Sequence, residues 1–364
     1  MAVPAIAHVR PSGPLRWILP RLNASDHWTM IGSLSAEDRC LAAVHAAAAI
    51  TKDLDVILLR IEPDTRTKWP EWLTENRLKT EANAGLAENA FGKQSIRPAG
   101  SIQDIDHDIS ILADDITGRC EGDVVLDVST MPKRFFFTVM TKLARSKKVR
   151  TLIATNTSPK AYGKELARDP DHWRQLPIYC GDSDLNDEAP KSITATPLII
   201  GVGYHTLNIR EILGRAPNRR FGIKLFLPFP SLHPGFTENW KFIHSIRSEW
   251  DRQVSEPIEI VRTPINDVSV TFDRLLQYSN QGTAASLVLA PFGPKTLSLA
   301  MCLLGIARFD LGISTEIGYT QPRVYSPNYS SGSGDVTAFC IKLNGQSLYA
   351  LEPNSGTTHP GDVS

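Results

Sequence analysis

The stretch DVVLDVSTMPKRFFFTV, residues 123–139, decides the fold. It starts with a run of apolar, β-branched residues, crosses a short polar loop, and passes through Pro132-Lys133 into a segment with helical spacing. A strand buried on both faces, followed at once by a helix with proline near its first turn, is typical of a parallel α/β sheet. The same arrangement returns as SLVLAPFGPKTLSLA at residues 286–300, with Pro294-Lys295 in the matching place.

These two stretches belong to a longer internal repeat with a period near 163 residues. TNTSPKAYG at 155–163 matches GYTQPRVYS at 318–326, and TEN at 74–76 returns at 237–239. Short pairs such as Pro-Lys recur in any long chain, but a shared order and spacing is harder to obtain by chance. Because the period is too long for a solenoid repeat, each copy should be a whole domain.

Strands and helices alternate in both copies. Apolar runs at 26–33, 54–63 and 123–129 in the first copy correspond to runs at 196–203, 221–230 and 286–293 in the second, with helical segments between them. We therefore predict an α/β fold with two tandem Rossmann-like, doubly wound parallel-sheet domains related by internal duplication, a pseudo-dimer.

The predicted domains cover residues 1–190 and 191–351, and residues 352–364 are expected to form a disordered tail. This division agrees with the length of 364 residues, because chains of this size usually split into domains of about 150–200 residues. The segment SSGSGD, Ser330–Asp335, is expected to be a flexible loop.

Charge and cysteine usage restrict the function classes. The 39 basic and 39 acidic side chains balance, which argues against broad nucleic-acid or membrane-surface binding. The five scattered cysteines show no CxxC spacing, so we predict no disulfide framework and no metal site. Apolar runs stay below the roughly 18 residues of a membrane span, and the N-terminus lacks a signal-peptide pattern. We expect a cytoplasmic protein with no cofactor.

The loops after the strands hold the candidate ligand-binding residues, since open α/β sheets bind ligands at the carboxyl ends of their strands. Glycines, hydroxyls and a cation beside a helix N-terminus suit a phosphate. Alternatively, Gly and Ser only close the turns, Pro-Lys only starts a helix, and the tyrosines pack in the core. The candidates are Ser129, Thr130, Lys133, Arg134, Thr157, Lys160, Tyr162, Gly201, Gly203, His205, Gly293, Lys295, Thr296, Thr320, Arg323 and Tyr325.

The sequence nominates no catalytic centre. It contains no GxxxxGK[ST], GxSxG or HExxH pattern, and the GVG at Gly201 does not extend to GxGxxG. His205 and His233 follow strands of the second copy without counterparts in the first. Asp127 ends a strand where Leu289 stands in the second copy. Whether the chain is an enzyme stays open at this point, and a non-catalytic role is favoured.

Two tandem Rossmann-like domains with a basic residue opening the helix after a central strand resemble the CARF and SAVED sensors of prokaryotic antiviral systems. The resemblance is architectural, covers about residues 25–350, and has its best local matches in DVSTMPKR and APFGPKT. It implies a ligand-sensing subunit that binds a cyclic oligonucleotide or other phosphorylated small molecule between its two halves. Because no effector segment is recognised in the chain, it also implies a separate effector protein.

Three function classes follow from this reading. The first is a ligand-sensing or scaffolding subunit of an antiviral defence system. The second is an enzyme acting on a nucleotide or sugar phosphate, with His205, His233 or Asp127 as acid or base. The third is a structural subunit whose sheets dock a partner protein.

Overall fold

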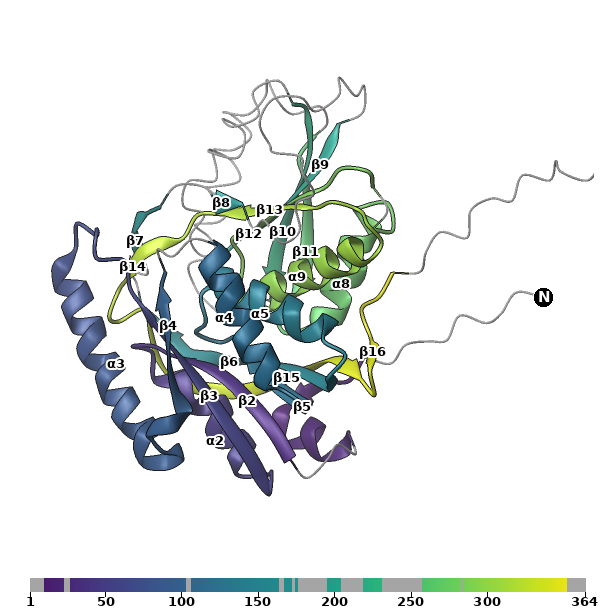
Figure 1. Cartoon of the computed structure of the whole chain (residues 1–364). Coiled ribbons are helices and arrows are strands. Elements are labelled where there is room, and N and C mark those ends of the chain that lie inside the picture. The colour runs from purple at the N-terminus through teal and green to yellow at the C-terminus, as the bar shows by residue number, and fades with distance from the viewer. Residues whose placement is uncertain are drawn as a thin grey trace, which may run out of the picture.

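The structure is a computed structural model, and it describes residues 10–22, 27–102, 106–163, 167–171, 174–175, 195–203, 219–230, 257–282 and 284–351. Two sheets with helices packed against them make up this part of the chain (Figure 1). The predicted α/β class is confirmed, because most neighbouring strands in both sheets run parallel. The predicted tail at 352–364 lies outside the described residues.

The first sheet has five parallel strands in the order β4-β3-β2-β5-β6, extended on one side by the antiparallel strands β15 and β1. Neighbouring residues point to opposite faces, so that Met30 joins one apolar cluster and Ile31 the other. The strands are β1 (Ser12–Pro14), β2 (His27–Leu34), β3 (Asp53–Glu62), β4 (Ile96–Ser101), β5 (Gly122–Asp127), β6 (Val149–Tyr162), β15 (Ser330–Leu343) and β16 (Gln346–Ser347), which pairs with β15.

Helices cover both faces of this sheet. The N-terminal helices and α2 pack on one face, and α4 and α5 pack on the other. Helix α5 is the most buried of them, because residues 134–141 are all buried. The helical elements are α1 (Leu15–Ile18), η1 (Leu19–Arg21), η2 (Asp38–Leu41), α2 (Ala42–Ala48), α3 (Pro70–Phe91), η3 (Lys93–Ser95), α4 (Asp106–Arg119) and α5 (Lys133–Arg145).

The second sheet has the order β11-β10-β9-β12-β13-β8, and only its edge strand β8 is antiparallel to its neighbour. If the parallel strands of each sheet are numbered in the order in which they occur in the chain, both sheets have the same spatial order, 3-2-1-4-5. The elements are β8 (Arg174–Gln175), β9 (Thr196–Gly201), β10 (Phe221–Phe229), β11 (Glu259–Pro264), β12 (Val288–Pro291), β13 (Glu316–Tyr319), α8 (Val268–Gln277) and α9 (Lys295–Asp310).

The two halves exchange edge strands. Strand β8 follows β6 in the chain but pairs with β13, whereas β15 follows β13 but pairs with β6. The crossing segments β7 (Ala167–Pro170) and β14 (Pro322–Tyr325) pair with each other. The division near residue 190 stays a prediction, but segments 1–190 and 191–351 are interlocked. The expected flexible loop at Ser330–Asp335 is wrong, because these residues are the first part of β15.

Helices α5 and α9 join the two sheets at the centre of the molecule (Figure 1). One apolar cluster runs without interruption from the first sheet through both helices into the second sheet. At the far end, Arg145 Nε of α5 lies 2.9 Å from Asp310 Oδ1 of α9. The two helices therefore run side by side in the same direction, and both begin at the carboxyl ends of the parallel strands. Within the described residues, no helix has the length and apolarity to cross a membrane.

Candidate functional site

A cavity of about 350 Å³ lies between the two sheets, at the carboxyl ends of their parallel strands. The loops after β2, β3 and β5 and the C-terminal half of β6 line it from the first sheet, and the loops after β9, β11, β12 and β13 line it from the second. Helix α3 and the crossing segment β14 contribute further walls. The volume falls within the range of small-molecule sites, about 300–1,000 Å³.

Ten of the sixteen predicted ligand-binding residues line this cavity. They are Ser129, Thr130, Lys133, Tyr162, Gly203, Gly293, Lys295, Thr296, Arg323 and Tyr325. Each follows or ends a strand, so the rule that ligands bind at the carboxyl ends of parallel strands located them.

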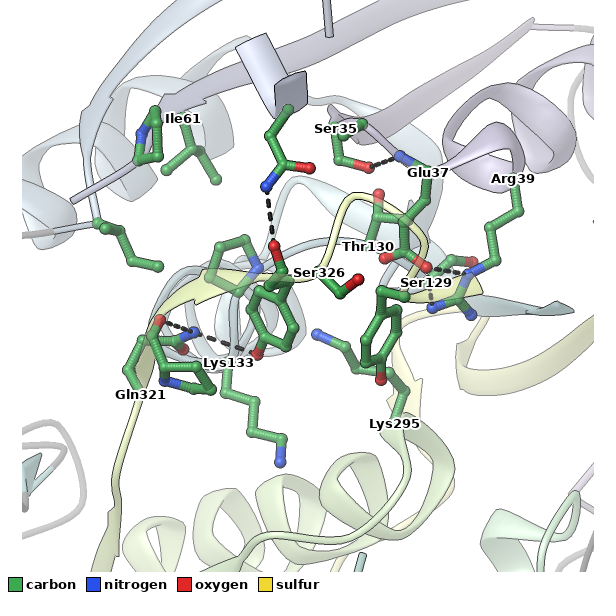
Figure 2. Close-up of a pocket in the computed structure, with 18 of the residues that line it drawn as sticks. Ser35, Glu37, Arg39, Ile61, Ser129, Thr130, Lys133, Lys295, Gln321 and Ser326 are labelled. Atoms are coloured by element: carbon green, nitrogen blue, oxygen red, sulfur yellow. Dashed lines mark hydrogen bonds and ion pairs between the residues drawn. The ribbon is translucent and has the colours of Figure 1, made fainter. Parts of the chain in front are cut away.

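The two lysines make reciprocal contacts across the cavity. Lys133 Nζ donates to the carbonyls of Pro291 and Gly293, the latter at 3.2 Å, and Lys295 Nζ donates to the carbonyl of Met131. Met131 and Gly293 each stand two residues before a lysine, so each lysine binds the loop that carries the other. Figure 2 shows the two side chains passing each other in opposite directions.

Both lysines are enclosed by protein atoms while part of each side chain faces the cavity. Burial, together with the charge of Arg39, lowers the pKa of Lys295 from 10.5 to about 7. Burial also lowers the pKa of Lys133 well below its usual range, with the charge of Lys295 adding to the effect. Within the described residues neither lysine has a carboxylate partner. A bound anion would therefore raise the pKa of each lysine, because an opposite charge favours its protonated form.

A buried hydrogen-bond network supports the loop after β5. Ser129 Oγ donates to Asp127 Oδ1 at 2.5 Å and accepts from the backbone N–H of Thr157 at 2.7 Å. Thr155 Oγ1 donates to the same carboxylate oxygen at 3.0 Å. Burial raises the pKa of Asp127 to about 6, although these donors oppose the shift. The carboxyl group does not line the cavity, so the network orients the loop and gives Asp127 no place for direct contact with a ligand.

Positive charge exceeds negative charge on the cavity wall. Among the described lining residues, six are basic, four of them arginines, and two, Glu37 and Glu62, are acidic. Three of the cations form ion pairs with nearby carboxylates: Arg39 with Glu37, Arg60 with Glu62 and Glu81, and Arg323 with a group of aspartates. The other three are Arg77, Lys133 and Lys295. This excess suits an anionic ligand.

Tyrosine rings form one side of the cavity. The ring of Tyr329 meets those of Tyr162 and Tyr325 edge to face, with centroids 5.7 and 5.2 Å apart. Burial raises the pKa of Tyr162 and of Tyr329, so both phenols stay neutral near pH 7. Tyr162 packs on another ring and borders the cavity, and its contact with a ligand stays a prediction.

Five predicted residues are described but do not line the cavity, and their contact with a ligand stays a prediction. Arg134 points away, with Nη2 2.7 Å from Asp106 Oδ1 and Nη1 donating to the carbonyl of Ile102. Thr157 and Thr320 are buried, and Lys160 extends across Gly332 on the outside. Gly201 lies behind the wall, where an added Cβ would come within 3.0 Å of Leu297 Cδ2.

Gly203 lines the cavity, and close packing also requires a glycine at this position. An added Cβ would lie 2.2 Å from the carbonyl oxygen of Phe292. Only glycine lets the loops after β9 and β12 approach so closely. The predicted candidates His205 and His233 lie outside the described residues.

Several residues that line the cavity are not among the sixteen predicted ligand-binding residues. The largest group comes from the loop after β2 and from α3, and a second group comes from the end of β13 and from β14. The residues of the loop after β2 could have been predicted from their position at a strand end. No local sequence pattern shows which face of α3 lines the cavity. The missed residues include Ser35, Glu37, Arg39, Arg60, Asn76, Arg77, Asn156, Tyr319, Gln321 and Tyr329.

No protein-family model matches the chain, and no curated protein matches its sequence. Among the described residues, no group of three or more His, Cys, Asp or Glu side chains is placed to hold a metal ion.

Proposed function

We propose that the protein is a ligand-sensing or scaffolding subunit that binds a nucleotide or another phosphorylated ligand in the cavity between its two halves. The observation that carries the proposal is the pair Lys133 and Lys295, which face one cavity from the first residues of two neighbouring helices. Neither helix has a side-chain cap at its start within the described residues. Two helix N-termini and two ammonium groups together favour an anion such as phosphate.

We further propose that the two halves arose by internal duplication of a Rossmann-like unit. The equal strand order of the two sheets supports this, as do the corresponding places of Lys133 after β5 and Lys295 after β12. Under this proposal the exchanged strands β8 and β15 are equivalent edge strands, and the cavity lies on the pseudo-two-fold axis.

We base two further parts of the proposal on the architectural resemblance to CARF and SAVED sensors. These are that the protein acts in antiviral defence and that a separate effector protein is its partner. A cytoplasmic location agrees with the four described cysteines, which are buried and unpaired with one another. One observation favours ligand retention over catalysis: the carboxyl group of Asp127, a candidate acid or base, lies outside the cavity.

A binding screen tests this function. Calorimetric titration with mononucleotides, linear oligonucleotides and cyclic oligonucleotides should identify at least one ligand, and mass spectrometry should recover it unchanged. Lys133→Ala and Lys295→Ala should each weaken its binding by about ten-fold or more, the size expected for one charge-assisted hydrogen bond. Lys93→Ala, at an exposed position outside the cavity, is the matched control and should bind like the wild type.

Other outcomes point to the other classes. Conversion of the ligand during the titration would identify an enzyme acting on a nucleotide or sugar phosphate. A protein that binds none of the compounds but recovers a stable partner by pull-down would be a structural subunit. Equal affinity of the wild type and both lysine variants for an identified ligand would refute the assignment of the cavity.

A further inference from the structure

The cations of the cavity fall into two kinds. Arg39 and Arg60 are held by carboxylates, with Arg39 Nη2 2.9 Å from Glu37 Oε2 and Arg60 Nη2 2.5 Å from Glu81 Oε1. Arg323 lies within 3.4–3.6 Å of three aspartates. A ligand that recruited one of these guanidinium groups would have to compete with an existing ion pair, so they suit a structural role in the wall.

Arg77 belongs to the other kind. It lines the cavity from α3, its side chain is exposed, and within the described residues it has neither a carboxylate partner nor a hydrogen bond. An arginine presents a planar fork of donors that matches a phosphate in a bidentate contact. Its whole hydrogen-bonding capacity is therefore available to a ligand.

Helix α3 holds Arg77 in a fixed position. Asn76 donates to the carbonyl of Tyr325 at 2.9 Å, Lys79 to that of Pro327 at 2.6 Å, and Asn83 to that of Ser35 at 2.8 Å. These three bonds attach the helix to two different loops around the cavity. The position of Arg77 relative to the rest of the wall is thus set before any ligand binds.

Arg77 and the lysine pair lie on different walls. Figure 1 shows α3 at the outer edge of the molecule, apart from α5 and α9 at its centre. Lys133 and Lys295 stand at the start of those central helices, where each donates to a backbone carbonyl of the other half. Arg77 therefore borders the cavity from a different element than the lysine pair.

We propose that Arg77 is a second anion contact, so that the ligand carries two separate anionic groups, one at the lysine pair and one at Arg77. This inference rests on the proposed function and narrows its ligand class to compounds with at least two separated phosphates. A nucleoside bearing a phosphate on each side of the sugar is the simplest probe of this class.

The test compares nucleoside 5′-monophosphates with nucleoside 3′,5′-bisphosphates of the same four bases, by calorimetric titration of the full chain. The wild type should bind at least one bisphosphate about ten-fold or more tightly than its monophosphate. In Arg77→Gln this preference should disappear, with the monophosphate affinity unchanged. Arg77→Lys should keep part of the preference, because it retains the charge without the fork. Arg97→Gln, an exposed arginine of β4 outside the cavity, is the control.

The outcomes separate this inference from the proposed function. Equal affinity of the wild type for the two classes, or a preference that persists in Arg77→Gln, overturns the role of Arg77 and leaves the lysine site standing. If the wild type binds neither class and Lys295→Ala changes nothing for any other ligand, the proposed function and the inference fall together.

Discussion

Replacement of Lys295 by methionine should invert the stability difference between variant and wild type as the pH rises. Methionine keeps the length of the side chain and removes its charge. Burial lowers the pKa of Lys295 from 10.5 to about 7 in the folded protein. The folded state therefore binds fewer protons than the unfolded chain between these two values, and the free energy of unfolding rises with pH in that window.

The size of the effect follows from the shift. Each pKa unit corresponds to about 1.4 kcal/mol, so the full shift would destabilise the fold by about 5 kcal/mol below pH 7. Because part of the side chain faces the open cavity, solvent screening should leave about half of this, ~2 kcal/mol. The penalty is fully present below pH 7 and is lost as the pH approaches 10.5.

The methionine variant also loses the hydrogen bond to the carbonyl of Met131, which costs about 1 kcal/mol at every pH. At pH 7 the variant should thus be more stable than the wild type by about 1 kcal/mol, near pH 10 about equally stable, and near pH 11 less stable by about 1 kcal/mol. Lys133, whose pKa is also lowered by burial, remains in the variant, so its pH dependence should be reduced and not abolished.

Urea unfolding followed by circular dichroism, at intervals between pH 7 and pH 11, measures these free energies. Lys93→Met replaces an exposed lysine and should follow the wild-type curve throughout. Parallel curves for Lys295→Met and the wild type would show that the ammonium group is as well solvated in the folded protein as in the unfolded chain, and would refute the reasoning.

Two other substitutions separate support of the fold from contact with a ligand. Arg134→Ala removes the ion pair with Asp106 and should lower the free energy of unfolding by about 1.5–3 kcal/mol. Calorimetric titration should show unchanged affinity for any ligand identified. A ten-fold loss of affinity would show that Arg134 contacts the ligand. Ser129→Ala leaves the Asp127 carboxylate without one donor and the N–H of Thr157 without its acceptor, and should cost about 1–3 kcal/mol in urea unfolding. A Ser129 variant as stable as the wild type would mean that water replaces the hydroxyl.

Part of the candidate site can be predicted from the amino-acid sequence, as individual residues show. Lys133 and Lys295 were located from their place after buried strands, since the ends of parallel strands meet at one edge of a sheet. Arg134 was placed with Lys133 because the two are neighbours in the chain. Successive helical residues point about 100° apart, so one of them faces the cavity while the other is buried against α4.

The alternation of strands and helices, the loops that carry the two lysines, and the α/β class can all be predicted from the amino-acid sequence, because apolar periodicity and turn residues act over a few neighbouring positions. Three features become visible only in the folded chain: β8 and β15 change sheets, each lysine bonds to the opposite loop, and Arg77 on α3 lines the cavity. Those outcomes depend on which edge hydrogen bonds and which side-chain directions remain once distant segments have packed together. Local residue patterns carry no information on either, so the partners of a charged side chain become defined only when the chain has folded around it.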